Sequence, residues 1–359
     1  MAYVGVDLHT TKFTAVFKEK NGSEVTESYY LHDDGVNKFI QDLSEDDYVF
    51  VEASTPTFEF ADRLKDRIKS LVVVDPFQFR LIKDSRKKND KDDSKDLAKM
   101  GKYHAETGED FLPEVYIPGK DIRRLRSLFT TYNLIKKEMN QTKNRIHSLL
   151  KQLFLPYSKT EFFEEKRYKL DELEIAEVYK LQIKSLLTVL DELKVQKEKI
   201  KGEILLSGED YLKDIDILTS ISGISVFTAL GLISDYVTVE RFPNAKKFCK
   251  YLRSTPRTEQ SNEKVKTGKT QRSGRKLSMG LMLQSMNHLK NSADYLDDFY
   301  SRLKGAKSAG KARVALVRKM FKIIYFMLRD REYYYHMDED LHERKMREYR
   351  WLLKKKKVA

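Results

Sequence analysis

The chain has 359 residues, which by the usual size of domains predicts two or three domains. Hydrophobic residues make up 40% and aromatic residues 11% of the chain, enough to build real cores and to exclude wholesale disorder. The net charge of +13 favours a polyanionic partner, nucleic acid above all, over a surface that is charged only for solubility.

Several classes of protein are excluded by what the sequence lacks. Cys249 is the only cysteine, so a disulfide within the chain and a thiolate zinc cluster are both ruled out. The seven histidines are scattered without ligand-like spacing, which argues against a zinc enzyme. The start of the chain does not read as a secretory leader, and no apolar run reaches membrane-spanning length. We therefore expect a cytoplasmic location, in a bacterial cell and close to the nucleoid.

The first 75 residues predict a mixed α/β sheet. Apolar and alternating runs at residues 3–6, 13–17 and 25–30 favour a three-stranded antiparallel meander. A helix is expected over residues 35–43. Further strands at 48–51 and 71–74, with a helix at 58–69 between them, imply a parallel crossover. This combination is typical of the ribonuclease-H kind of sheet.

Beyond residue 120 the pattern becomes helical. Asp121 to Leu155 predicts one long helix, and residues 183–204 carry a heptad seam that suits a coiled coil or a helical hairpin, within this chain or with another copy. The seam runs through Ile183, Leu186, Leu190, Leu193, Lys197, Ile200 and Ile204. The tight turn at 221–225 could present backbone N–H groups to a phosphate or be purely structural. The lysine-rich end of the chain is interpreted as a solvated arm.

These elements predict an α/β plus α architecture in four parts. Residues 1–118 form the sheet domain with its catalytic acids, and residues 119–208 form a helical or coiled-coil region. Residues 209–330 form a mostly helical second domain, and residues 331–359 form a basic C-terminal tail.

Four carboxylates are placed where they can converge. Asp7 and Glu52 each end an apolar strand, and Asp90 and Asp93, three residues apart, share one face at the start of a helix. Converging carboxylates repel one another without a cation, and oxygen-only ligands favour Mg²⁺ or Mn²⁺. Two such ions can assist cleavage of a phosphodiester. The lysine-rich stretch around Asp90 also fits a merely solvated helix.

Basic residues gather in two further places. The helix from Asp121 and a loop after Thr258 are both interpreted as surfaces for the nucleic-acid backbone, although a solvated helix face explains the first almost as well. The helix contributes Arg123, Arg124, Arg126, Lys143 and Arg145, and the loop contributes Lys264, Lys266, Lys269, Arg272 and Arg275.

The sequence resembles the DEDD transposases of the insertion-sequence-110 family, which include Piv-type DNA invertases. The resemblance rests on Gly5-Val6-Asp7-Leu8-His9, on Val51-Glu52-Ala53-Ser54, on the acidic stretch from Lys88 to Ala98, and on a second region from Leu218 to Leu277. It implies a RuvC-like fold whose metal-binding tetrad is Asp7, Glu52, Asp90 and Asp93. It also implies a C-terminal transposase (Tnp) domain whose nucleophilic serine falls on Ser261 and forms a covalent phosphoserine with DNA.

The resemblance further implies a structured bridge RNA as guide and oligomers that act on paired target and donor DNA. The chain departs from the family pattern at three points. Asn262 stands where the family has Gly after the serine, Ser54 stands for Thr in the motif after Glu52, and Asp92 beside Asp93 leaves two choices of fourth ligand.

Two other functions are compatible with the residues alone. A junction-resolving endonuclease of the RuvC-like kind would use the same acids and water, without a covalent serine intermediate. A basic scaffold with degenerate acids would bind nucleic acid and catalyse nothing.

Overall fold

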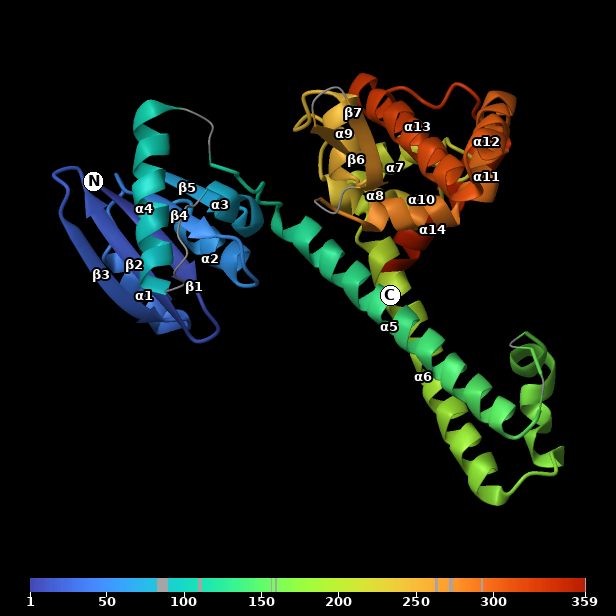
Figure 1. The fold of residues 1–359 in the computed structure, drawn as a ribbon. Helices are drawn as coiled ribbons and strands as arrows, with labels where there is room; N and C mark the ends of the chain where they lie inside the picture. Colours follow the sequence, from blue (N-terminus) through green and yellow to red (C-terminus); the bar gives the residue numbers. More distant parts are fainter. Residues whose placement is uncertain are drawn as a thin grey trace. The chain divides into compact units, whose positions relative to one another are not determined.

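The computed structural model describes residues 1–82, 90–108, 112–155, 157–158, 160–261, 264–270, 274–291 and 293–358. The chain divides into two compact units, Met1–Pro118 and Gly119–Ala359 (Figure 1). The finer division of the second unit at residues 208 and 330 stays a prediction. In the part of the chain that is described, no helix is both long and apolar enough to cross a membrane.

The first unit is built on a five-stranded mixed sheet with the strand order β3-β2-β1-β4-β5. β1 (Ala2–Leu8), β2 (Lys12–Glu19) and β3 (Glu24–Tyr30) form the antiparallel meander. β4 (Tyr48–Glu52) and β5 (Ser70–Val74) extend the sheet in parallel on the other side of β1. The predicted mixed sheet is confirmed, because β-branched and aromatic residues occupy the predicted strands.

The two faces of this sheet bury different cores. α1 (Asp33–Gln41) and α2 (Thr57–Leu64) cover one face, where Phe13, Phe39 and Phe60 pack edge to face and stacked against one another. α4 (Asp90–Thr107) crosses the opposite face (Figure 1). α3 (Pro76–Ile82) follows β5. Both faces of β1 are therefore buried, as expected for a strand that is parallel to its neighbour in an α/β layer.

α4 packs directly on the backbone of the sheet because two glycines leave room for it. A methyl group at Gly5 would lie 2.0 Å from the carbonyl oxygen of Ser94 and 2.5 Å from the amide nitrogen of Ala98. Gly101 of α4 lies against the ring of Phe50 in the same way, since a methyl group at Gly101 would lie 2.3 Å from the nearest ring carbon. The hydroxyl of Ser94 donates to the carbonyl of Thr14 in β2 at 3.1 Å. Close approach of this kind is a role that only glycine fills.

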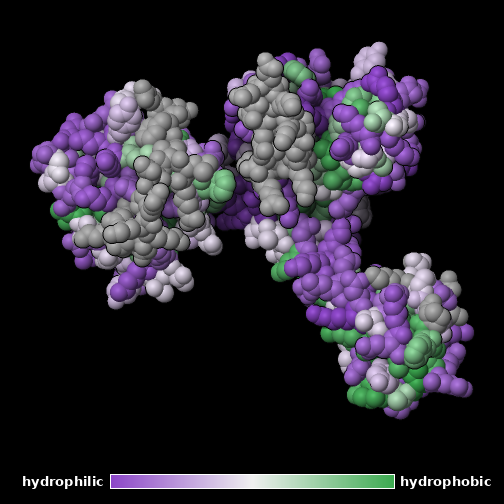
Figure 2. All heavy atoms as spheres, in the orientation of Figure 1, coloured by the Kyte–Doolittle hydropathy of each residue, from purple (hydrophilic) through white to green (hydrophobic). Residues whose placement is uncertain are grey.

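The second unit begins with a long helical hairpin. α5 (Lys120–Gln152) and α6 (Glu177–Leu206) run side by side in opposite directions (Figure 1). The short turns η1 (Glu161–Lys166) and η2 (Arg167–Glu172) connect them. The end of the hairpin has its own apolar core, and Figure 2 shows hydrophobic residues gathered there. That core includes Ile146, Leu150, Phe162, Leu170, Ile183 and Leu187. The seam of α6 therefore serves the hairpin within this chain, one of the two arrangements that the heptad pattern left open.

The remaining helices of this unit surround one large core. η3 (Glu209–Tyr211) leads into it, and α8, α10 and α13 contribute much of the apolar surface. Its elements are α7 (Leu212–Thr219), α8 (Val226–Tyr236), α9 (Ala245–Tyr251), β6 (Pro256–Ser261), β7 (Lys264–Thr270), α10 (Leu277–Gln284), α11 (Met286–Lys290), α12 (Asp294–Ala306), α13 (Ala309–Asp330) and α14 (Glu339–Val358). The α/β plus α fold class is thus confirmed.

Two local predictions were wrong. The region after Thr258, expected as a loop, is an antiparallel hairpin of β6 and β7, because β-branched residues recur along it. The lysine-rich end of the chain, expected as a solvated arm, is part of the helix α14, although Lys354, Lys355 and Lys356 are exposed as expected. Met346, Tyr349 and Leu353 are each less than 9% exposed and lie on one side of that helix. Burial of this stripe against the core orders a segment whose charge alone suggests a free tail.

Candidate active site

Asp7 and Glu52 lie at the same level on neighbouring strands. β1 and β4 are parallel, with Val6 opposite Val51, so the two acids that follow are the next pair across the strands. Side chains alternate along a strand, and Gly5 faces α4, so Asp7 faces α4 as well. The same alternation places Glu52 on the face of Phe50, which packs against α4. Both acids are half-buried.

The first turn of α4 reaches this edge of the sheet. Ser94 lies over Gly5, whereas Glu106, twelve residues later, accepts a hydrogen bond from the hydroxyl of Tyr3 at 3.2 Å. α4 therefore runs antiparallel to β1, and its N-terminus points toward the end of the strand that carries Asp7. Asp93 in this first turn is half-buried. Asp90 is the first residue of α4, and its side chain lies outside the described residues.

The turn that follows Glu52 is fixed by a buried threonine. The hydroxyl of Thr57 donates to the carbonyl of Glu52 at 2.9 Å and accepts from the amide of Ser54 at 2.8 Å. The amide of Ala53 donates to Val74 at 2.9 Å, which ties the same turn to β5. The backbone of Glu52 is therefore held on both sides.

His9 is a neighbour of this site that the sequence reasoning missed. Its Nε2 atom lies 3.2 Å from Oδ2 of Asp7, and its side chain is 43% exposed. The spacing of the histidines among themselves gives no sign of this contact. The signal that could have found His9 is its position two residues after an acid at a strand end.

The carboxylates are the groups here that could hold a metal ion. Among the side chains that the structure describes, no three of His, Cys, Asp and Glu form a cluster able to hold one. The fold nevertheless brings Asp7 and Glu52 to one sheet edge with the first turn of α4, and oxygen donors of this kind suit Mg²⁺ or Mn²⁺. The donor chemistry thus fits a divalent cation, and the tetrad of Asp7, Glu52, Asp90 and Asp93 stays a prediction.

Ser261 lies in the second unit, at the end of β6. Its backbone pairs with Lys264, the first residue of β7, and its side chain lies outside the described residues. Asn262, which replaces the glycine of the family pattern, and Arg272 lie outside the described residues. Lys266 and Lys269 are on β7, and their side chains are likewise outside that description.

The base of this hairpin is anchored by a fully buried carboxylate at the end of α8. Asp235 is 0% exposed, and its Oδ2 accepts hydrogen bonds from the amide and hydroxyl of Ser278 at 2.8 and 2.9 Å. Its Oδ1 accepts from Nε of Arg275 at 2.9 Å. The amide of Arg275 donates to the carbonyl of Tyr251 at 2.9 Å, and Nε of Arg253 donates to Gly274 at 2.6 Å. The segment that leaves the hairpin is therefore fixed to α8, α9 and α10.

Arg126 of α5 joins the same network. Its guanidinium donates to the carbonyls of Ser234 at 2.6 Å and Asp235 at 3.2 Å, at the C-terminal end of α8. Burial, and then the nearby charge of Arg275, lower the pKa of Arg126. Arg126 and Arg275 were both predicted to contact nucleic acid. Their positions show them bonded within the unit, where they cap helix α8 and hold its buried acid.

The other predicted basic residues of α5 differ in exposure. Arg124 is exposed and lies 3.1 Å from Asp121, and Arg145 is exposed. Lys143 lies 5.3 Å from the ring centroid of Phe163, and Arg123 is half-buried. Of this group, Arg124 and Arg145 are thus the most accessible to a phosphate backbone.

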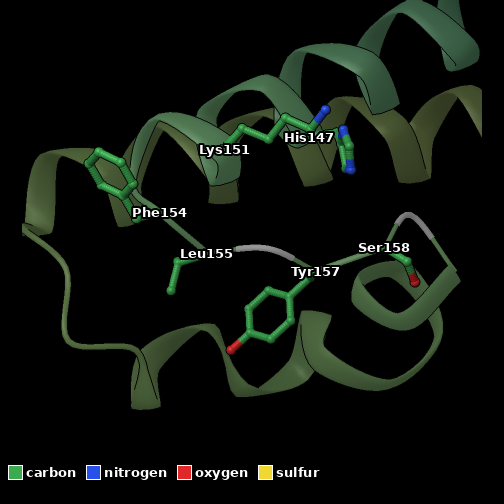
Figure 3. Close-up of a pocket in the computed structure, with 6 residues that line it drawn as sticks. All are labelled: His147, Lys151, Phe154, Leu155, Tyr157 and Ser158. Carbon is green, nitrogen blue, oxygen red and sulfur yellow. The ribbon is translucent and has the colours of Figure 1, made fainter.

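A cavity of about 480 Å³ lies at the far end of α5 (Figure 3). Its described lining contains no carboxylate and consists of His147, Lys151, Phe154, Leu155, Tyr157 and Ser158. Without an acid it does not offer the chemistry of the sheet edge.

Comparison with known families gives two matches, one beginning in each unit. A profile of the DEDD transposases of the IS110 type matches residues 4–155. A profile described as the transposase IS116/IS110/IS902 family matches residues 215–301. None of the curated proteins compared with the chain matches it. The two profiles include the sheet edge with Asp7 and Glu52 and the hairpin with Ser261. The chain therefore belongs to the IS110 family of transposases and is a DNA-rearranging enzyme.

Proposed function

We propose that this transposase cuts and rejoins DNA through Ser261 as nucleophile, with assistance from a divalent cation held by Asp7, Glu52, Asp90 and Asp93. The observation that carries the proposal is that Asp7 and Glu52 directly follow the paired residues Val6 and Val51 on neighbouring parallel strands, on the face where α4 begins. Carboxylates that converge at a strand edge can hold Mg²⁺, and a bound Mg²⁺ can assist phosphodiester cleavage. The same four residues are those that the family resemblance implies.

In the proposed reaction, the Oγ atom of Ser261 attacks a DNA phosphorus. The new Oγ–P bond replaces one P–O bond to deoxyribose, which leaves as a free hydroxyl end and can later reverse the step. A bound Mg²⁺ would supply charge stabilisation for the phosphate oxygens. The segment that follows the hairpin is bonded to the buried Asp235, and a fixed attachment of this kind supports an oriented attack by Ser261.

Trapping a covalent adduct tests the serine. Labelled DNA carrying the element's ends is incubated with the protein and Mg²⁺, and the denatured mixture is separated on a gel. The adduct should disappear in Ser261→Ala and persist in Ser301→Ala, which removes an exposed serine of α12. Cleavage that survives in Ser261→Ala would instead support a water-using, junction-resolving nuclease.

Calorimetry with Mn²⁺ tests the acids. We expect Asp7→Asn and Glu52→Gln to weaken Mn²⁺ binding and to abolish cleavage, because each removes a charged oxygen donor. Asp66→Asn, a matched change at an exposed acid of the same unit, should bind Mn²⁺ as the wild type does. DNA processing that is unchanged in Asp7→Asn would contradict the metal proposal and favour the scaffold.

We also propose that a bridge RNA guides the enzyme and that it acts as a homo-oligomer through the α5–α6 hairpin. The support for the second point is an apolar set on α6 that the hairpin leaves exposed: Val178, Leu181 and Val189 are 57%, 65% and 49% exposed. Sedimentation should show smaller particles for the pair Leu181→Glu and Val189→Glu. It should show no change for Gln41→Glu, at an exposed position of α1 in the first unit. An RNA-free preparation that recombines DNA unaided would refute guidance.

A further inference from the structure

The C-terminal helix α14 forms one side of a cleft of about 610 Å³ that the proposed chemistry does not use. The lining residues of α14 recur every three to four positions and so share one helix face. They are His342, Glu343, Met346, Arg347, Arg350, Trp351 and Lys354, and Asp216 of α7 and Tyr333 complete the cleft.

This wall of the cleft is rigid. Tyr349 is buried, and its hydroxyl donates to the carbonyl of Leu205 at 2.8 Å. The ammonium of Lys345 lies 2.9 to 3.3 Å from four carbonyl oxygens of the segment that joins α7 to α8, those of Thr219, Ile221, Ser222 and Ile224. Because both Tyr349 and Lys345 bond to other parts of the unit, the face of α14 that lines the cleft has a fixed orientation.

Both carboxylate oxygens of Asp216, which lines the cleft, already have partners within the chain. Oδ2 of Asp216 accepts from the hydroxyl of Tyr333 at 2.9 Å, and its Oδ1 lies 3.0 Å from Nε2 of His342. The ring of His342 packs against that of Tyr333, with 5.6 Å between centroids. One carboxylate oxygen of Asp216 thus contacts Tyr333 and the other contacts His342. Glu343 is the other acid of the lining.

The open part of the cleft combines cations with exposed aromatic rings. Trp351 is 62% and Tyr333 is 50% exposed. Arg347, Arg350 and Lys354 line the same cleft, and from residue 349 to the end of the chain the sequence has no acid. Lys355 lies 5.3 Å from the centroid of the Trp351 ring. Rings and phosphate-binding cations on one rigid face are the features that bind single-stranded nucleic acid.

We propose that this face of α14 binds an unpaired stretch of nucleic acid, with a base stacked on Trp351 and the flanking phosphates on Arg347, Arg350 and Lys354. A duplex keeps its bases stacked on one another and offers the indole no free ring face, so an unpaired strand is the occupant that uses both features. Membership of the transposase family supports only one part of this inference, namely that the protein binds nucleic acid. It does not depend on Ser261 or on the four acids.

Fluorescence of Trp351 tests the proposal, because it is the only tryptophan of the chain. The full chain, in EDTA so that no metal chemistry intervenes, is titrated with a twelve-nucleotide uridine RNA, a twelve-nucleotide thymidine DNA and a duplex of the same length. Both single strands should quench the emission, and the tighter of the two identifies RNA or DNA as the natural occupant. Quenching by the duplex at equal affinity, or by none of the three, would overturn the proposal.

Variants separate stacking from charge. Binding of the single strand, followed by a label on the oligonucleotide, should weaken about tenfold in Trp351→Ala and much less in Trp351→Phe, which keeps a ring. The pair Arg347→Gln and Arg350→Gln should reduce the salt slope of log K by about 1.4, since each phosphate that a cation no longer neutralises lowers it by about 0.7. The matched pair Lys304→Gln and Lys307→Gln, at the C-terminal end of α12, should leave that slope unchanged. Equal effects of the two pairs would refute a defined site on α14.

Discussion

Replacing Gly5 by alanine is the sharpest test of how the sheet positions its acids. The new methyl group would lie 2.0 Å from the carbonyl oxygen of Ser94 and 2.5 Å from the amide nitrogen of Ala98, both backbone atoms of α4. Real Cβ contacts are essentially never shorter than 3.0 Å, so helix and strand must separate by about 1 Å. The displaced segment is the first turn of α4, which carries Asp93, and the strand continues to Asp7 two residues later.

Two separate losses are expected from this change. Overpacking of a tight interface costs about 1–3 kcal/mol of folding stability. A displacement of about 1 Å at a catalytic group lowers the rate about 100-fold. The rate should therefore fall even at temperatures where Gly5→Ala is fully folded, because the change displaces the acids that are proposed to hold the metal ion and does not unfold them.

Denaturant unfolding and the rate of DNA cleavage, measured on the same preparation, check both losses. Gly202→Ala is the matched control, since a methyl there meets nothing within 4 Å and the residue lies inside α6. It should gain about 0.5–1 kcal/mol of stability and keep its activity. A Gly5→Ala protein with wild-type stability and wild-type rate would refute the close packing of α4 on β1.

Three further changes test other parts of the structure. Asp235→Ala removes the acceptor of three hydrogen bonds from a buried position and should cost about 3–5 kcal/mol in denaturant unfolding, whereas a loss below about 1 kcal/mol would show that Arg275 finds other partners. Thr57→Val should cost about 1–3 kcal/mol and slow cleavage, because the turn after Glu52 loses the three hydrogen bonds of this hydroxyl, to the carbonyl of Glu52 and to the amide and hydroxyl of Ser54; cleavage at the wild-type rate would contradict this role. Burial lowers the pKa of Lys345 to about 8 from the ordinary 10.5, so the folded chain holds this proton less firmly than the unfolded chain. Wild type should therefore gain stability relative to Lys345→Met as pH rises from about 8 to about 10.5, and thermal unfolding of the two proteins with no such divergence would argue against it.

The sheet was predictable because its signals are local. Runs such as Tyr48–Val51 are long enough to define strands, and an acid directly after such a run marks the strand end. The parallel crossover then follows from the helix between two buried strands. The neighbouring positions of Asp7 and Glu52 can be predicted from the same local signals, because each acid directly follows the apolar run of its strand.

The contacts that refine the site depend on parts of the chain far apart in sequence. Nothing near Gly5 in the sequence indicates that Ser94 lies against it, because the approach involves backbone atoms and no side-chain pattern. His9 was missed because its role comes from one neighbour, Asp7, and not from other histidines.

Counting charges indicated the right class of partner without distinguishing what each cation does. Arg126 and Arg145 both lie on α5 and look alike in the sequence. Arg126 is bonded to the last carbonyls of α8, whereas Arg145 is exposed. The difference arises because the C-terminal carbonyls of a buried helix need donors, and the nearest available guanidinium satisfies them. The sequence shows how many Arg and Lys residues there are, but not which of them are hydrogen-bonded to buried carbonyl or carboxylate groups of the same chain.

A buried acceptor also determines the role of Arg275, which follows the hairpin that carries Ser261. Asp235 could have been paired with any cation, yet it binds Arg275 and the amide of Ser278, the residues through which the β6–β7 hairpin returns to the core. A buried charge paired in this way fixes geometry more than it adds stability, because desolvation offsets most of the attraction. In the proposed reaction Ser261 holds a broken DNA strand until it is rejoined, so the segment that carries it must keep its position. The ion pair of Asp235 and Arg275 lies near the end of the hairpin where Pro256 pairs with Thr270. Ser261, the proposed nucleophile, is at the opposite end, where it pairs with Lys264.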